Sequence, residues 1–357
     1  MNLYFGVTIA PYAVDFCNAL HERFHCRIFH REVDVAGLAF DPLDVEKECR
    51  FPFERYDSGL GWRAFRQLWK LVREERPEVV FTSEFSLTTI RLWMIKWLSR
   101  VPFQLVSICD DSLDMIEGND FSRRHRLARH FVPPLTDELI LANPPARKWY
   151  QDHFGKGLLM PIISDENRLR RSFKAALSRS LELSAQVNPE GKALVLFVGR
   201  LIPLKNLSFL LEAAKGLSVK LVFVGDGPEE QALRRKAAGV DIFFAGRKSG
   251  EDLYAWFNLA DVLVLPSLQE AFGAVTGEAL SAGCPVIVSS CAGSACLVRE
   301  GENGSVVSPT DLPAWKEALS RWAVPHVHEG IRPSLLPLSF EQCINDLIHQ
   351  LPCESTD

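Results

Sequence analysis

The sequence lacks the features that mark secreted, zinc-binding and membrane-spanning proteins. Its nine cysteines include no C-x-x-C pair, and several lie in apolar runs such as Leu105–Cys109. This usage is typical of a reducing compartment, where cysteine acts as a small hydrophobic residue. No apolar run approaches the roughly 18 residues that a membrane span needs. Because Met1–Ala10 also lacks the basic region and cleavage site of a signal peptide, we expect a cytoplasmic protein.

The sequence also lacks a large excess of either positive or negative charge. The formal net charge of −5 gives the chain no general attraction to nucleic acid, and its second half shows no basic face. The first half is the more basic and is rich in arginine, which suits an acidic surface or substrate. A 47% apolar fraction excludes a largely disordered chain, and 357 residues are enough for two domains with cores of their own.

Short apolar runs alternate with amphipathic stretches along nearly the whole chain. Val262–Leu265 and Val286–Val288 are apolar without alternation, as in parallel strands that are covered on both faces. The pattern therefore predicts two doubly wound α/β domains with parallel sheets. The expected strands are Leu3–Ile9, Cys26–His30, Glu78–Thr82, Phe103–Ile108 and Glu138–Ala142 in the first half, and Ala193–Val198, Val219–Val224, Ile242–Ala245, Val262–Leu265 and Pro285–Val288 in the second.

A polar, poorly patterned stretch from Ser164 to Lys192 separates these halves. We place the first domain at residues 1–164 and the second at 165–337. A last amphipathic segment, about 338–351, follows a linker that contains Pro333 and Pro337. This segment is expected to form a helix that packs back on the first domain or, alternatively, on the second.

Ligands of open parallel sheets bind beyond the carboxyl ends of the strands, so binding residues are expected in the loops at those ends. The loop after 193–198 contains Gly199, Arg200 and Lys205. A guanidinium fork beside a point charge is the pair of cations that a diphosphate needs. The alternative is a turn with two solvated cations. The next loop, 225–229, is neither G-x-G-x-x-G nor a P-loop, and a purely structural turn is the favoured interpretation.

The loop after Val262–Leu265 is the most informative. Glu270 and Glu278 flank Phe272, Gly273, Ala274 and Val275, whose backbone amides stand at the expected start of a helix and could bind an anion. Glu270 could accept hydrogen bonds from sugar hydroxyls, and Glu278 could hold a vicinal diol such as a ribose. Each glutamate alone has a plain alternative, as a loop carboxylate or a solvated helix residue.

Taken together, these motifs resemble a retaining glycosyltransferase of family 4. The resemblance covers about residues 193–310 and includes the Glu-x7-Glu spacing of Glu270 and Glu278. Its other motifs are Val198–Leu201 with Lys205, Val224–Pro228, Ala260–Val262 with Pro266 and Ser267, and Ala282–Ser289. The family implies a GT-B fold, in which two Rossmann-like domains face a cleft.

The resemblance also implies roles for the loop residues. Arg200 and Lys205, together with Glu270, would form the catalytic centre: the two cations bind the donor diphosphate, and Glu270 contacts the donor sugar. Glu278 would hold the ribose. The donor site would be completed by the amides of Phe272, Gly273, Ala274 and Val275 and by Gly199, Gly246 and Arg247, the last two near the base.

The implied reaction moves a sugar from a nucleotide-sugar, UDP-sugar being favoured and GDP-sugar the alternative, to a hydroxyl of a glycan or lipid-linked acceptor. Surface polysaccharide or glycoconjugate synthesis is the expected setting. Preorganised cations stabilise a leaving diphosphate without a metal, so no cofactor and no metal ion are expected beyond the nucleotide-sugar co-substrate.

The first half departs from the family pattern. The loop Ala10–Asp15 has no glycine, although related enzymes usually carry a Gly-rich loop there, so a backbone contact to phosphate is in doubt. Asp110 and Asp111 follow the strand that ends at Ile108, and Asn143 follows the next. These three residues are candidates for binding the acceptor, with capping or solvated turns as the alternative.

Two further segments are candidates for a peripheral contact with the inner face of a membrane. Residues 91–100 combine two tryptophans with cations, and residues 123–130 are strongly basic. The alternatives are a buried sheet-packing helix for residues 91–100 and a solvated helix face for residues 123–130.

For the whole chain, the rival functions are a non-hydrolysing sugar-nucleotide epimerase, which needs further acids and histidines, and a non-catalytic sugar-nucleotide-binding subunit.

Overall fold

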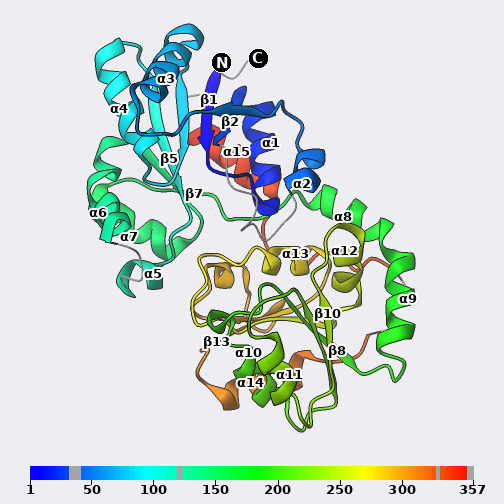
Figure 1. Cartoon of the computed structure of the whole chain (residues 1–357). Coiled ribbons are helices and arrows are strands. Elements are labelled where there is room, and N and C mark those ends of the chain that lie inside the picture. Colours follow the sequence, from blue (N-terminus) through cyan, green and yellow to red (C-terminus); the bar gives the residue numbers. More distant parts are fainter. Residues whose placement is uncertain (32–41, 119–122, 327–329, 352–357) are drawn as a thin grey trace. The chain divides into compact units, whose positions relative to one another are not determined.

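The computed structural model describes residues 1–31, 42–118, 123–326 and 330–351. These residues form two compact units (Figure 1). Unit 1 comprises Met1–Ser164 with the C-terminal segment from Glu341 onward, and unit 2 comprises Asp165–Phe340. No helix among the described residues is long and apolar enough to cross a membrane.

Unit 1 is built on a parallel sheet in the order β3-β2-β1-β4-β5-β6-β7. The order in which successive strands are added reverses between β1 and β4, and this point is the switch point of a doubly wound fold. The strands are β1 (Asn2–Gly6), β2 (Cys26–Arg31), β3 (Glu54–Tyr56), β4 (Val79–Ser83), β5 (Gln104–Cys109), β6 (Glu138–Leu141) and β7 (Leu158–Leu159).

Several helices pack against this sheet. Leu68 and Val72 of α3 pack with Leu92 and Ile95 of α4 in one core cluster, and α4, α6 and α7 share a second. The described helices are α1 (Val14–Arg23), α2 (Pro42–Glu48), α3 (Trp62–Glu75), α4 (Leu87–Ser99), α5 (Leu113–Gly118), α6 (Arg123–Phe131), α7 (Pro144–Phe154) and α15 (Phe340–Gln350), with short 3-10 turns at Pro11–Ala13 and Pro133–Leu135.

The last helix, α15, returns to unit 1 and lies beside α1 (Figure 1). Arg23 of α1 donates hydrogen bonds to Glu341 (2.9 Å) and Asn345 (2.7 Å) of α15. Ile344 and Leu347, three residues apart on one face of α15, are fully buried. The amphipathic segment near the end of the sequence therefore contributes to the core of the unit with which the chain begins.

Unit 2 holds a second parallel sheet in the order β10-β9-β8-β11-β12-β13. Its strands are β8 (Ala193–Val198), β9 (Val219–Val224), β10 (Ile242–Gly246), β11 (Val262–Leu265), β12 (Val286–Ser289) and β13 (Gly304–Val307). Its helices are α8 (Glu166–Ala175), α9 (Leu177–Val187), α10 (Leu207–Ala214), α11 (Glu230–Lys236), α12 (Gly250–Leu259), α13 (Val275–Ser281) and α14 (Leu312–Trp322), with 3-10 turns at Pro203–Lys205 and Gly293–Leu297.

The predicted α/β class with two parallel sheets is confirmed, and every expected strand overlaps an observed one. The first strand ends at Gly6 rather than Ile9. Sequence reasoning missed β3, β7 and β13, which lie at sheet edges and have two to four residues each. Edge strands bury only part of their length, so they lack the continuous apolar run that identified β11 and β12.

The loops at the carboxyl ends of β8 and β9 approach so closely that they require glycine. A Cβ on Gly225, whose φ is +139°, would lie 1.9 Å from the Gly199 carbonyl oxygen. We predict that Gly225→Ala lowers the free energy of unfolding by about 3 kcal/mol or more, because backbone must move. Gly239→Ala is the matched control: its φ is +80° with open space around the new methyl, and about 1 kcal/mol is expected. Equal losses in urea unfolding would contradict this account.

Candidate functional site

Three loops at the carboxyl edge of the unit 2 sheet are joined by backbone hydrogen bonds. The Gly199 amide donates to the Val224 carbonyl (2.9 Å), and the Leu201 amide donates to the Asp226 carbonyl (2.7 Å). The Leu268 amide donates to the Leu204 carbonyl (2.9 Å). The loops after β8, β9 and β11 are therefore one connected structure. Loop 225–229 holds the backbone of the cationic loop 199–205 through these hydrogen bonds. This agrees with the prediction that loop 225–229 is a structural turn.

Lys205 and Glu270 meet where the first and third of these loops touch. Their side chains form an ion pair, and each is only 16% exposed. The Ser267 hydroxyl donates a second hydrogen bond to the Glu270 carboxylate (3.3 Å). The fold thus brings a cation and a carboxylate into direct contact, although they are 65 residues apart along the chain.

The backbone around Glu270 is hydrogen-bonded to the segment that follows β12. The Glu270 amide donates to the Cys291 carbonyl (3.3 Å), and the Gly293 amide donates to the Glu270 carbonyl (3.2 Å). The Phe272 carbonyl accepts from the Ser294 amide (2.7 Å). These bonds fix the direction in which the Glu270 side chain leaves the loop.

A tight turn at Gly273 leads into α13. The φ of Gly273 is +91°, and a Cβ there would lie 2.6 Å from Leu265 Cδ2, so both conformation and space require glycine. The first hydrogen bonds of this turn run from Thr276 to Gly273 and from Glu278 to Ala274. The amides of residues 272–275 therefore precede the helical ladder and have no acceptor within it.

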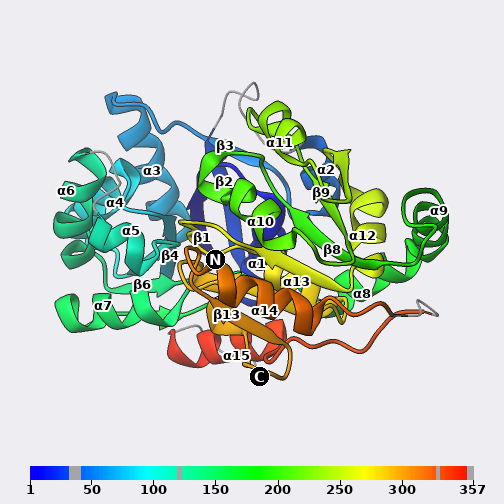
Figure 2. The same ribbon diagram turned by 90° about the horizontal axis from the view of Figure 1, so that it is seen from below.

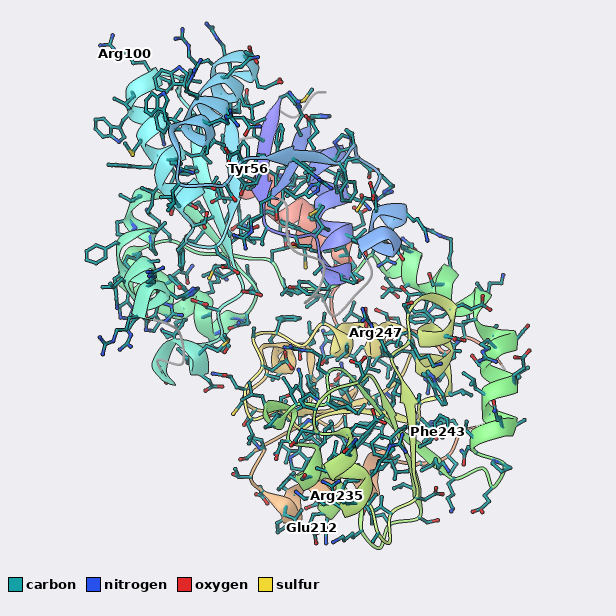
Figure 3. All side chains as sticks on the ribbon, in the orientation of Figure 1. Tyr56, Arg100, Glu212, Arg235, Phe243 and Arg247 are labelled. Carbon is teal, nitrogen blue, oxygen red and sulfur yellow. The ribbon has the colours of Figure 1, made fainter. Side chains whose placement is uncertain are left out.

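The remaining predicted donor-site residues lie around this cluster. Arg200 is exposed next to Gly199, and Glu278 is partly buried in the first turn of α13. The Gly246 carbonyl accepts a hydrogen bond from the Gly225 amide (2.9 Å), which joins the end of β10 to the same edge. Arg247 follows Gly246 and is exposed (Figure 3). This edge combines cations, carboxylates and a helix start, which together can bind a polar anionic ligand.

In unit 1, Asp111 and Asn143 have structural partners. Asp111 is 3% exposed and accepts hydrogen bonds from Arg129 Nε (2.8 Å) and Tyr150 Oη (2.9 Å). Asn143 caps α7 by accepting from the Ala146 amide (2.9 Å), and its amide group donates to the Asp111 carbonyl (3.0 Å). This network fixes the ends of β5 and β6, and a role of either residue toward an acceptor stays a prediction.

Asp110 has a different environment from Asp111. Burial, together with the nearby carboxylates of Glu84 and Asp111, raises the pKa of Asp110 to about 6. Glu84 directly follows β4 and has a left-handed φ of 55°. Sequence reasoning missed Glu84, although its place after a strand of the same sheet was a usable signal. Asp110 and Glu84 make this edge acidic, in contrast to the cationic loop of unit 2.

The structure offers no metal centre to either unit: among the described residues, no group of three or more His, Cys, Asp or Glu side chains could hold a metal ion.

Comparison with known proteins identifies the fold. Residues 192–323 match the family model described as Glycosyl transferases group 1, and this segment contains the three joined loops. Among solved structures, sucrose-phosphate synthase from Thermosynechococcus elongatus superimposes with a TM-score of 0.64 at 21% identity, covering 90% of this chain and 91% of that one. The Anabaena protein HepE in complex with UDP-glucose gives 0.70 at 17% identity, covering 90% and 89%. The fold is GT-B.

Sequence similarity to curated proteins is confined to part of the chain. The sulfoquinovosyl transferase of Arabidopsis thaliana is 31% identical over 172 residues, which are 44% of this chain and 34% of that protein. The chain thus spans about a third of the length of the curated relatives it matches.

The raised pKa of Asp110 leads to a testable pH dependence. An acid with a raised folded-state pKa contributes stability below its unfolded pKa, and this contribution is lost as the pH rises through about 6. We predict that Asp110→Asn changes stability little at pH 4 and increases it by about 1–3 kcal/mol at pH 7.5. Unfolding of both proteins between these pH values measures the difference; a difference that does not vary with pH would show that Asp110 ionises normally.

Proposed function

We propose that this protein is a retaining glycosyltransferase of family 4 that transfers a sugar from a UDP-sugar to an acceptor hydroxyl. The observation that carries the proposal is the contact between Lys205 and Glu270 at the junction of the loops after β8 and β11. The segment that matches the glycosyl transferase family model supplies both residues. The GT-B fold agrees with the proposal.

The ion pair is suited to receive a diphosphate. A lysine ammonium has three donors, so Lys205 can bind a phosphate oxygen and retain a hydrogen bond to Glu270. Arg200, exposed beside Gly199, would supply a second cation, and the amides of residues 272–275 would bind the remaining oxygens. The remaining lone pairs of the Glu270 carboxylate would accept hydrogen bonds from the donor sugar. Glu278 would hold the ribose, and Gly246 and Arg247 would contact the base.

Catalysis in this proposal rests on charge stabilisation. Negative charge develops on the diphosphate as the sugar–oxygen bond breaks, and the cations of Arg200 and Lys205 would stabilise it. The acceptor oxygen bonds to the anomeric carbon on the face from which the diphosphate leaves, and the departing phosphate oxygen takes the acceptor's proton. The anomeric configuration is therefore retained. No metal ion and no protein base is required, and Glu270 acts as a positioning carboxylate that also stabilises positive charge on the sugar.

The donor and acceptor are the finer parts of the proposal. UDP is preferred to GDP because a structure of similar fold was solved with UDP-glucose. The acceptor would be a glycan or lipid-linked hydroxyl in surface polysaccharide or glycoconjugate synthesis, at the cytoplasmic face of a membrane. Asp110 is the best placed of the three acceptor candidates, because Asp111 and Asn143 are engaged in structural hydrogen bonds.

The donor site is tested by nucleotide binding. We expect UDP to raise the melting temperature of the full chain and Lys205→Met to weaken UDP binding about 10–100-fold, the effect of losing one hydrogen bond to a charged group. Glu278→Ala should weaken UDP binding by a similar factor and leave the binding of free diphosphate unchanged. Arg235→Ala, an exposed cation on α11, is the matched control. Equal UDP affinity in all four proteins would contradict the assignment.

The reaction is tested by nucleotide release from a panel of UDP- and GDP-sugars, with and without EDTA. Release that EDTA does not reduce, and that Lys205→Met and Glu270→Gln lower, is the expected result. Interconversion of the donor sugar without any acceptor would identify an epimerase instead. Binding of UDP without turnover of any donor, with every acceptor class tried, would identify a binding subunit.

A further inference from the structure

Helix α4 is apolar on the face that it turns away from its own core. Leu92 and Ile95 are fully buried against the sheet. On other sides of the helix, Met94 is 41% exposed, Trp97 74% and Leu98 61%. A surface helix of a globular protein usually presents polar residues to solvent. Tryptophan and leucine at this exposure therefore mark a contact site for something outside unit 1.

Helix α6 lies next to α4 and has a similar outer face. Ile90 of α4 and Ala128 of α6 pack against the same core cluster, and both views of the ribbon show the helices as neighbours (Figures 1 and 2). Leu127 and Phe131 of α6 are exposed, as are three arginines on the same short helix. We call the exposed residues of the two helices the α4/α6 surface: Met94, Trp97, Leu98, Arg100, Arg123, Arg124, Arg126, Leu127 and Phe131.

The charge of this surface has one sign. Neither α4 nor α6 contains an aspartate or a glutamate. Arg100 follows the last residue of α4 and projects from the end of unit 1 (Figure 3). Of the cations on these helices, Lys96 is paired with Asp137 and Arg129 with Asp111. Arg123, Arg124 and Arg126 are exposed on α6.

We infer that the α4/α6 surface docks on a membrane of anionic phospholipids. Trp97, Leu98 and Phe131 supply apolar side chains that enter the boundary between headgroups and acyl chains, while the arginines bind phosphates. A second copy of this chain fits less well, because a two-fold contact would set the same arginines against each other. Interfacial docking also needs no spanning helix, and none is present among the described residues. The inference does not depend on the proposed enzymatic activity.

The test is flotation of the 357-residue chain with vesicles of phosphatidylcholine alone and of phosphatidylcholine with about one third phosphatidylglycerol. We expect binding to the anionic vesicles only, and weaker binding as NaCl is raised from about 0.05 to 0.5 M. Trp97→Ser/Leu98→Ser and Arg123→Glu/Arg124→Glu/Arg126→Glu should each reduce the partition coefficient at least about tenfold. Trp97→Phe/Leu98→Met should retain binding.

Leu181→Ser and Arg235→Glu are the matched controls in unit 2, since Leu181 is also 61% exposed and Arg235 is an exposed cation. Neither control should change binding. Absence of anionic-vesicle binding by the unmodified protein, or equal binding by all variants, would overturn the inference. Sedimentation without vesicles is the second measurement: a dimer that Trp97→Ser/Leu98→Ser dissociates would assign this surface to a second copy instead. UDP binding, measured alongside, reports separately on the proposed donor site.

Discussion

The ion pair between Lys205 and Glu270 is the contact on which the account of this protein depends. It closes a gap of 65 residues along the chain and joins loops from two adjacent strands, β8 and β11. Both groups are largely buried, and a buried charge without its partner is costly. The backbone bonds on either side of the pair, to β9 and to the segment after β12, hold it in one arrangement. The local structure thus maintains charges at an edge where a sheet protein binds its ligands.

Much of this arrangement could be predicted from residues alone. The continuous apolar runs of β11 and β12 identified buried parallel strands, and parallel strands bring the loops at their carboxyl ends to one edge. Gly199, Arg200 and Lys205 could therefore be assigned to the same neighbourhood as Glu270. The direct contact of Lys205 with Glu270 could not, because it depends on side-chain reach and on the turn that Gly273 permits.

In unit 1, the environments of individual side chains could not be predicted from the sequence. Asp110 and Asp111 are adjacent and look alike in the sequence, yet one is held by Arg129 and Tyr150 and the other has a raised pKa. These differences come from residues 18 to 39 positions away, which no local pattern reveals. The edge strands β3 and β7 were missed for a related reason, since short and partly covered strands have little apolar periodicity. The exposed face of α4 likewise required knowledge of which helix side the sheet covers.

A structure of this chain with UDP bound would test the assignment of Lys205 and Glu278 to the donor site. We expect UDP to bind at the loops after β8 and β11, with a diphosphate oxygen within hydrogen-bonding distance of Lys205 Nζ and the ribose hydroxyls on Glu278. Lys205 should turn toward the phosphate while Glu270 keeps its backbone bonds to the Cys291–Gly293 segment. UDP bound elsewhere, or bound with neither Lys205 nor Glu278 in contact, would contradict the account.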